Sequence, residues 1–426
     1  MISYSEPFLL SDTGSDRATA YVWGNKSVTL GDKTHVFWTD AIARTMARTY
    51  DPAAGAWSDG VFIGDGTDNH NSPSVTADAE GRLRVAYGPH GPWDQVHRPL
   101  TWPSGRFRYT IADAPNSLKG LDQINDAVGF NATYAYLLHT TAGIDCIAYR
   151  GGEEPYQLVF QRQASRGGWE NPVFLMKQDI VPQYTWYGPN MACHADGTLY
   201  AAGCFYGLER KASLGCAILR SPDYGETWTD IAGEAVDPPI EYHERFAVPH
   251  GPAEFDPRLQ GLGLDPDGRV WATTVTTYPK CSDGAVLSRW NGSAWESFDL
   301  NPHLPDGRQI FSAPMCVDTK GRVHIFVSAY CPSQLPSRDE AGFGHVSLRV
   351  YHMVTSDAGA TFTCNEIGES VPGVPNWQPT ISQQGPYHPV ENPVLLYTTG
   401  TKTPDSEERC RSTHHTRVYC VRVQTK

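Results

Sequence analysis

The sequence lacks the features of several protein classes. It has no run of about 18 apolar residues, which argues against a membrane-spanning helix. Lys and Arg number 34 against 47 Asp and Glu, for a net charge of −13, and they form no basic run. We therefore expect no nucleic-acid or membrane partner, since both are bound through clustered cations. The start of the chain has no signal-peptide pattern, so localisation stays open: exported or periplasmic if a signal was removed, cytoplasmic otherwise.

The ten cysteines contain no C-x₂-C pair, so a zinc-ribbon framework is not indicated. Most of them are expected to be buried thiols. His194, Cys193, Cys204 and Cys216 lie close enough along the chain to form a metal site. A structural zinc or calcium ion is nevertheless not indicated by any motif.

One element recurs along the chain, a turn containing Asp, Ala or Gly followed by a short strand of alternating apolar residues. Repeats at such spacing are typical of β-propellers, in which each repeat supplies one blade. The seven copies are GDKTHVFWTD from 31, DAEGRLRVAYG from 78, TAGIDCIAYR from 141, HADGTLYAAG from 194, DPDGRVWATT from 265, DTKGRVHIFV from 318 and HPVENPVLLYTTG from 388.

A second signature is a polar turn that ends in an aromatic residue. SPDYGETW, ending at Trp228, and SDAGATF, ending at Phe362, fit the Asp-box, whose polar side chains bond the turn backbone. Strand-like alternation, 40 glycines, 32 prolines and no long helical period favour an all-β chain. The sequence therefore predicts one seven-bladed β-propeller domain over residues 1–426, with four antiparallel strands per blade. We expect a monomer whose ring is closed by pairing one chain end with the blade at the other.

Four polar residues occupy equivalent places in two successive repeats. His70 precedes the SPSVTADAEG strand and His90 follows RLRVAYG, while Tyr134 and Arg150 stand at the corresponding points one repeat later. Inner strands of a propeller converge on a central channel, so these positions can meet in one pocket. Two imidazoles, a phenol and a guanidinium would form an acid–base site with an anion clamp.

At these residues the sequence resembles a known family. DNHNSPSV, DAEGRLRVAYGPHG and AGIDCIAYRGGEEPYQLVFQRQASRGGW resemble the BNR-repeat propeller polysaccharide lyases, which include ulvan lyases and rhamnosyl-glucuronate lyases. The resemblance is best over residues 60–230. It implies cleavage of an acidic polysaccharide or oligosaccharide at a uronic acid by β-elimination, which requires no cofactor. The histidine that the family places shortly before CAILRSPDYGETW is missing.

The resemblance also implies roles for the four residues. Arg150 would pair with the uronate carboxylate and make the C5 proton acidic. Tyr134 or His70 would remove that proton, one of them would protonate the departing O4, and His90 would orient its partners. In a glucuronate, Tyr134 alone could act on one face of the sugar. An iduronate would require two residues, for which His70 and Tyr134 are the natural pair.

Further residues are candidates for sugar binding, because aromatic faces stack on sugars and cations bind carboxylate or sulfate. They lie in three loops, QYTWYGPN, FYGLERK and EYHERFAVPHGP. The candidates are Tyr184, Trp186, Tyr187, Arg210, Tyr242 and His243.

Two alternative functions remain open. A glycoside hydrolase of α-L-rhamnosidase type could use the same scaffold, and would need two suitably spaced carboxylates. Asp65, Asp68 and Asp94 are available, but they have the character of turn residues. A non-catalytic carbohydrate-binding propeller would use the 12 tryptophans and 21 tyrosines for stacking.

Overall fold

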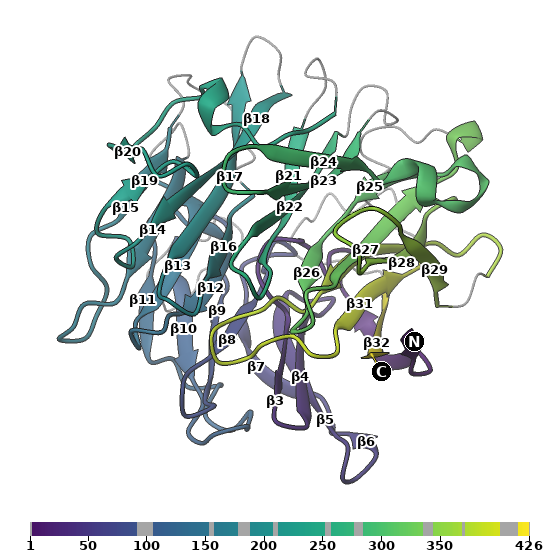
Figure 1. Cartoon of the computed structure of the whole chain (residues 1–426). Helices are drawn as coiled ribbons and strands as arrows, with labels where there is room; N and C mark the ends of the chain where they lie inside the picture. Colours follow the sequence, from purple (N-terminus) through teal and green to yellow (C-terminus); the bar gives the residue numbers. More distant parts are fainter. Residues whose placement is uncertain are drawn as a thin grey trace.

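Short strands joined by tight turns make up almost all of the described chain. The structure, a computed structural model, describes residues 2–91, 105–152, 157–177, 188–207, 212–251, 257–276, 284–334, 344–368, 371–400 and 416–425. The strands form seven antiparallel sheets that follow one another around a ring, so the predicted seven-bladed β-propeller is confirmed (Figure 1).

Each of the first three blades begins with its innermost strand and proceeds outward. Blade 1 contains β3 (Ser27–Leu30), β4 (Lys33–Thr39), β5 (Arg44–Asp51), β6 (Ala56–Trp57) and β7 (Val61–Asp65); blade 2 contains β8 (Ser74–Ala77), β9 (Leu83–Tyr87), β10 (Phe107–Ile111) and β11 (Asp126–Val128); blade 3 contains β12 (Thr133–His139), β13 (Asp145–Gly151), β14 (Gln157–Arg162) and β15 (Val173–Met176).

The next three blades repeat this order. Blade 4 contains β16 (Asn190–Cys193), β17 (Leu199–Gly207), β18 (Ala212–Ser221), β19 (Trp228–Thr229) and β20 (Ala235–Val236); blade 5 contains β21 (Pro257–Leu264), β22 (Val270–Thr276), β23 (Ala285–Trp290) and β24 (Trp295–Asp299); blade 6 contains β25 (Gln309–Ser312), β26 (Met315–Val317), β27 (Val323–Tyr330), β28 (Arg349–Thr355) and β29 (Thr363–Ile367).

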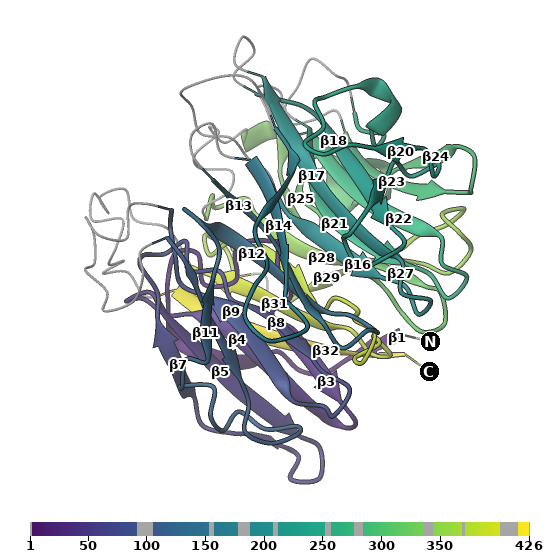
Figure 2. The ribbon, with the colours of Figure 1, turned by 90° about the vertical axis from the view of Figure 1, so that its left-hand side faces the viewer.

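Blade 7 closes the ring with strands from both ends of the chain. Its inner strands β30 (Asn376–Ile381) and β31 (Val394–Thr399) are followed by β32 (Thr416–Thr425). The N-terminal strands β1 (Ile2–Tyr4) and β2 (Phe8–Gly14) both pair with β32. The two chain ends therefore lie side by side, as both views show (Figures 1 and 2). The predicted closure is confirmed.

The recurring turn of the sequence joins the first and second strands of a blade. In blade 2, Asp78 Oδ1 accepts hydrogen bonds from the backbone N–H groups of Glu80 and Arg82, and Gly81 supplies the positive φ of 77° that closes the turn. Each of the seven copies leads into the second strand of its blade, from β4 to β31.

The hydrophobic core is divided among the interfaces between blades. Buried apolar residues form at least one cluster at each interface, with two between blades 6 and 7 and one between blades 7 and 1. Each blade is covered on both faces, so its inner strands are apolar on both sides. In β22, for example, Val270 and Ala272 pack toward blade 4 and Trp271 and Val275 toward blade 6.

The two Asp-boxes fix outer turns of blades 4 and 6. Asp223 Oδ1 accepts from the Thr227 N–H at 2.8 Å, and Asp357 Oδ1 accepts from the Thr361 N–H at 2.9 Å. Trp228 is buried and its ring meets Phe160 of blade 3 edge to face. Their predicted structural role is confirmed.

Helical structure is confined to single turns in the described residues. None of these is a long apolar helix that could cross a membrane, in the part of the chain that the structure describes. The turns are η1 (Glu244–Phe246), η2 (Asn301–His303), η3 (Pro305–Gly307) and η4 (Pro332–Gln334).

Candidate active site

The four residues singled out in the sequence lie at the same end of blades 2 and 3. His70 precedes β8 and His90 follows β9, while Tyr134 is the second residue of β12 and Arg150 lies near the end of β13. All four are at least nine-tenths buried. Ring contacts join three of them, with His70 centred 3.9 Å from His90 and 6.3 Å from Tyr134. The expected convergence of these positions is therefore found.

One carboxylate holds both imidazoles. Asp68 Oδ1 contacts His70 Nδ1 at 2.9 Å and Asp68 Oδ2 contacts His90 Nδ1 at 2.6 Å. A carboxylate only accepts, so each Nδ1 atom donates its hydrogen to Asp68, and His70 Nε2, which faces Arg17, holds a lone pair. Asp68 was expected to be a turn residue, and it does bind the His70 backbone N–H at 2.7 Å. It is also the centre of the site, 1% exposed.

Burial and a neighbouring cation favour the neutral form of His70. Arg17 Nη1 contacts His70 Nε2 and the hydroxyl of Tyr21. Burial, together with the charge of Arg17, holds the pKa of His70 well below its usual value. Burial alone would raise the pKa of Asp68, but its electrostatic interaction and hydrogen bond with His70, and then those with His90, outweigh burial and keep the pKa well below the usual value. The resting pair is thus an aspartate beside a neutral His70.

Tyr134 and Arg150 form the second half of the site. The Arg150 guanidinium carbon lies 5.0 Å from the centre of the Tyr134 ring, a cation–π contact. Arg150 Nη2 also donates to the hydroxyl of Thr133, its register partner across β12 and β13, at 3.3 Å. Tyr134 has a φ of 61° within an irregularity of this strand pair, which turns its side chain away from the regular alternation of β12.

Residues 17–26, the segment before β3, form the floor of the site, which the sequence analysis missed. Tyr21 meets the Tyr134 ring edge to face at 4.7 Å and stacks on Trp23 at 5.2 Å. Trp23 in turn contacts Tyr134 at 5.2 Å and donates its Nε1 hydrogen to the carbonyl of Leu259 in blade 5 at 3.3 Å. The indole therefore spans the channel from blade 3 to blade 5. Only the place of this segment in the sequence could have indicated its role. Residues 17–26 precede the inner strand of blade 1, just as His70 precedes the inner strand of blade 2.

Asp68, His70 and His90 are the one group of three metal-type donors that lie together among the residues described. Their nitrogen–oxygen separations of 2.6 and 2.9 Å are those of direct hydrogen bonds. Ligands about 2.1 Å from a zinc ion in tetrahedral geometry would stand more than about 3 Å apart. Arg17 also brings a positive charge to His70. The three side chains are therefore hydrogen-bonded to one another in this structure.

The predicted sugar-binding residues have different outcomes. Tyr242 packs edge to face on Phe205 at 5.6 Å, and His243 Nδ1 accepts from the Arg245 N–H at the start of η1. These contacts lie in and beside blade 4, so the structure does not join this pair to the four central residues. Their role as sugar contacts stays a prediction. The other four candidates lie outside the described residues: Tyr184, Trp186, Tyr187 and Arg210.

The structure does not bring His194 together with the three cysteines that could have formed a metal site with it. Cys204 and Cys216 are adjacent across β17 and β18, with their sulfur atoms 3.3 Å apart. They face blade 5, whereas Cys193 faces blade 3. His194 Nδ1 instead pairs with Asp196 at 3.0 Å. Neighbouring residues of a strand point to opposite faces, which separates these side chains.

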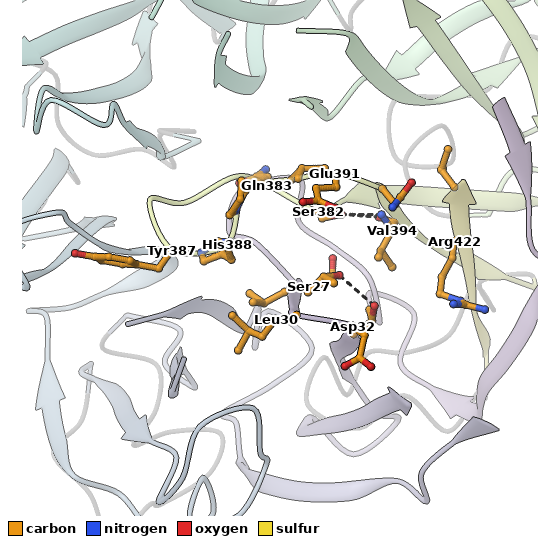
Figure 3. A pocket seen from close by; sticks show the side chains of 18 of the residues that line it. Ser27, Leu30, Asp32, Ser382, Gln383, Tyr387, His388, Glu391, Val394 and Arg422 are labelled. Atoms are coloured by element: carbon orange, nitrogen blue, oxygen red, sulfur yellow. Dashed lines mark hydrogen bonds between the residues drawn. The ribbon is translucent and has the colours of Figure 1, made fainter. Parts of the chain in front are cut away.

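The opposite face of the ring has a different character. There, residues 382–392 extend across the channel: Gln384 donates to the Leu264 carbonyl at 2.7 Å, and the Tyr387 hydroxyl donates to the Thr141 carbonyl at 3.3 Å. A cavity of about 390 Å³ lies beside this segment, between blades 7 and 1 (Figure 3). It is lined by the β3–β4 turn and the β30–β31 connection, and so lies at the other end of the blades from His70.

The chain belongs to a family of BNR repeat-containing proteins, whose family model matches residues 19–303. Among solved structures, a polysaccharide lyase PL25 ulvan lyase is similar at a TM-score of 0.68 with 15% identity, covering 93% of each chain. A PL25 ulvan lyase bound to -[GlcA(1-4)Rha3S]- gives 0.66 with 14% identity and the same coverage. The polysaccharide lyase Uly1 gives 0.57 with 13% identity, covering 98% of this chain and 99% of its own. At these identities the likeness concerns the fold. A search of curated protein sequences found no match.

Proposed function

We propose that the protein is a polysaccharide lyase that cleaves the glycosidic bond to a uronic acid by β-elimination. The observation that carries this proposal is the buried cluster of Asp68, His70, His90, Tyr134 and Arg150 at one mouth of the channel. It combines proton-transfer groups with a cation, as removal of a proton beside a carboxylate requires.

Arg150 is assigned to the substrate carboxylate. Charge that develops on this group as the C5 proton leaves would be stabilised by a guanidinium already in position. Arg150 is 2% exposed and rests on the Tyr134 ring, so a carboxylate that reaches it also reaches the phenol. The acidic chain as a whole repels polyanions, which makes local cations such as Arg17 and Arg150 necessary for binding.

Tyr134 is assigned to proton transfer. In the elimination the C5 proton passes to a base, the electron pair forms the C4–C5 double bond, and the C4–O4 bond breaks as O4 takes up a proton. Nε2 of His70 contacts Arg17, which favours Tyr134 over His70 as the group that acts first. An iduronate needs two proton-transfer groups on opposite faces of the sugar, and neutral His70 then acts as the second group.

Asp68 and His90 support this arrangement. Both oxygens of Asp68 are bonded by the histidines, so its role is to fix their tautomers and orientation rather than to donate a proton to a leaving group. This argues for elimination over a hydrolase mechanism, which needs one carboxylic acid and one carboxylate. The solved relative bound to -[GlcA(1-4)Rha3S]- supports a polymer containing glucuronate and rhamnose as the substrate.

The proposal is tested with ulvan and with a rhamnosyl-glucuronate gum, each offered to the wild type and to Tyr134→Phe. The ultraviolet absorption of the unsaturated uronate should rise with the wild type. With the variant it should not rise, although binding of the polymer is retained. New reducing ends without this absorption would identify a hydrolase instead. Binding without any product would identify a carbohydrate-binding propeller.

A further inference from the structure

A buried lysine lies beneath the candidate active site. Lys26, directly before β3, is 1% exposed. Its Nζ donates to the carbonyl of Tyr21 at 2.7 Å, the carbonyl of Gly24 at 3.3 Å and the hydroxyl of Ser72 at 3.2 Å. An ammonium has three N–H donors, and here each has an acceptor.

These acceptors belong to the two segments that build the site. Tyr21 and Gly24 belong to the floor segment, and Ser72 follows His70 by two residues. Ser72 Oγ also accepts from the Tyr21 N–H at 3.2 Å. Lys26 therefore ties the floor segment to the segment that carries Asp68 and His70.

The main chain that Lys26 holds bears the ring that touches the proposed catalytic groups. Tyr21 is 4.7 Å from the Tyr134 ring and 6.1 Å from the His70 ring, centre to centre. Its position depends on a close approach of backbones, since a Cβ on Gly24 would stand 2.5 Å from the Ala135 carbonyl oxygen. A small shift of this segment would move Tyr21 against both catalytic groups.

The hydrogen bonds of Lys26 Nζ go to uncharged groups. The acidic side chains on the two segments that pack against it are Asp16 and Asp68. Asp16 accepts from Asn69 Nδ2 at 2.7 Å, and Asp68 is bonded by the two histidines. The remaining ionisable groups on these segments are Arg17, Tyr21 and His70, which contact one another.

We propose that Lys26 is a positioning residue of the active site, whose protonated side chain holds Tyr21 and the floor segment against Tyr134 and His70. The inference rests on the proposed function for its catalytic consequence. When Lys26 loses its proton, Nζ has two donors in place of three, and one of its hydrogen bonds to the two segments is lost. Turnover is therefore highest with Lys26 charged.

Because Lys26 is buried, its side chain changes charge near neutral pH. Removal of the ammonium from water lowers the pKa of Lys26 from 10.5 to about 7. The charged form thus prevails below that pH and is lost above it. Unfolded chains keep the proton up to about 10.4, so Lys26 makes the free energy of unfolding rise with pH between these two values.

The test compares the wild type with Lys26→Gln, whose amide keeps two donors and cannot be charged. We expect Lys26→Gln to lower kcat below pH 7 by about tenfold to 100-fold with little change in KM, because misplaced groups slow chemistry more than binding. Above pH 7, wild-type turnover should fall toward that of the variant, whose own profile should lack this step. Lys320→Gln, on an exposed turn at the opposite face, is the matched control and should leave the profile unchanged.

A second variant covers the case in which Lys26→Gln does not fold. Ser72→Ala removes one acceptor of the ammonium, so the fall in turnover should begin at lower pH than in the wild type. Wild-type kcat in Lys26→Gln below pH 7, or an unchanged profile in Ser72→Ala, would overturn the inference.

Failure of the lyase proposal is separable from failure of this one. If the wild type yields no unsaturated uronate, the lyase function fails alone. Lys26 is then judged by the pH dependence of the free energy of unfolding, which should differ between the wild type and Lys26→Gln above pH 7. Identical unfolding curves for the two proteins would contradict the inference without any turnover measurement.

Discussion

The imidazole rings of His70 and His90 stack with their centres 3.9 Å apart, and a single carboxylate between their Nδ1 atoms holds them there. Two cationic imidazoles could not share this position without repulsion. The pairing therefore favours a neutral His70, in keeping with its lowered pKa. Asp68 thereby sets the orientation of both imidazole rings.

Replacement of Asp68 by Asn should abolish this arrangement. The amide can accept from one histidine but presents N–H to the other, whose tautomer must then change. We expect kcat to fall by at least about 100-fold, within the range attributed to acid–base groups, with polymer binding retained. Steady-state kinetics and a binding isotherm would measure both.

Asp78→Asn is the matched control for Asp68→Asn. Asp78 is also a 1% exposed carboxylate of blade 2, but it lies at the opposite end, bonded to Arg82 and Arg84. This variant should lose stability without a comparable loss of kcat. Equal kinetic effects of the two substitutions would show that Asp68 matters only for folding.

Arg150→Lys tests the carboxylate clamp. A lysine keeps the charge but loses the planar, two-pronged geometry and the stacking on Tyr134. We expect kcat/KM to fall by about 10-fold to 100-fold, a loss typical of a good charge-assisted hydrogen bond. Arg162→Lys, on the outer part of the same blade and paired with Glu170, should leave kcat/KM near the wild-type value. A normal kcat/KM in Arg150→Lys would remove Arg150 from the site.

Gly24→Ala tests the floor. The added methyl would stand 2.5 Å from the Ala135 carbonyl oxygen, in addition to the strain of a φ of 89°. Gly31→Ala is the control, because its φ of 59° carries a similar backbone cost with nothing within 4 Å of the new Cβ. Thermal unfolding and kcat of both variants would be compared. Only Gly24→Ala should lose kcat, and equal kcat in the two would contradict a positioning role for the floor.

Stability should fall as the solution becomes acidic. Burial lowers the pKa of His35 and of His388 from 6.5 to about 4. Between pH 4 and pH 6.5 these two histidines bind protons in the unfolded chain but stay unprotonated in the folded chain. The free energy of unfolding is then lost as pH falls from about 6.5 toward 4, by up to about 1.4 kcal/mol per pH unit for each histidine.

Denaturant titrations across this range would measure the slope. His388→Gln keeps an acceptor for Thr76, whose hydroxyl lies 3.0 Å from His388 Nε2, and should make the slope shallower. His303→Gln, an exposed control, should leave it unchanged. A wild-type stability that is flat from pH 6.5 to 4 would contradict the lowered pKa values.

The fold could be predicted because each blade repeats the same local information. The residues of a turn such as Asp78 to Gly81 determine its geometry locally. The pattern of the strand that follows the turn indicates that both of its faces are buried. The ring then follows from the number of copies. His70, His90, Tyr134 and Arg150 could be grouped because equivalent points of neighbouring blades meet at one mouth of the channel.

The floor and the central role of Asp68 could not be predicted in this way. Trp23 reaches Leu259 of blade 5 only after the ring has closed, so no local pattern marks the contact. Asp68 belongs both to a turn and to the cluster with His70 and His90, and its neighbours in the sequence indicate only the turn. Lys26 was likewise missed, because a lone lysine before a strand is ordinarily solvent-exposed.

The most direct test of the central claim is the cleavage of a uronate-containing polymer in water enriched in heavy oxygen, with the products weighed by mass spectrometry. Elimination forms the double bond without taking oxygen from water. We expect products that are unsaturated at the new non-reducing end and carry no label from the cleavage step, after correction for exchange at the reducing end. Products that are saturated and have gained one labelled oxygen would contradict it and identify a hydrolase.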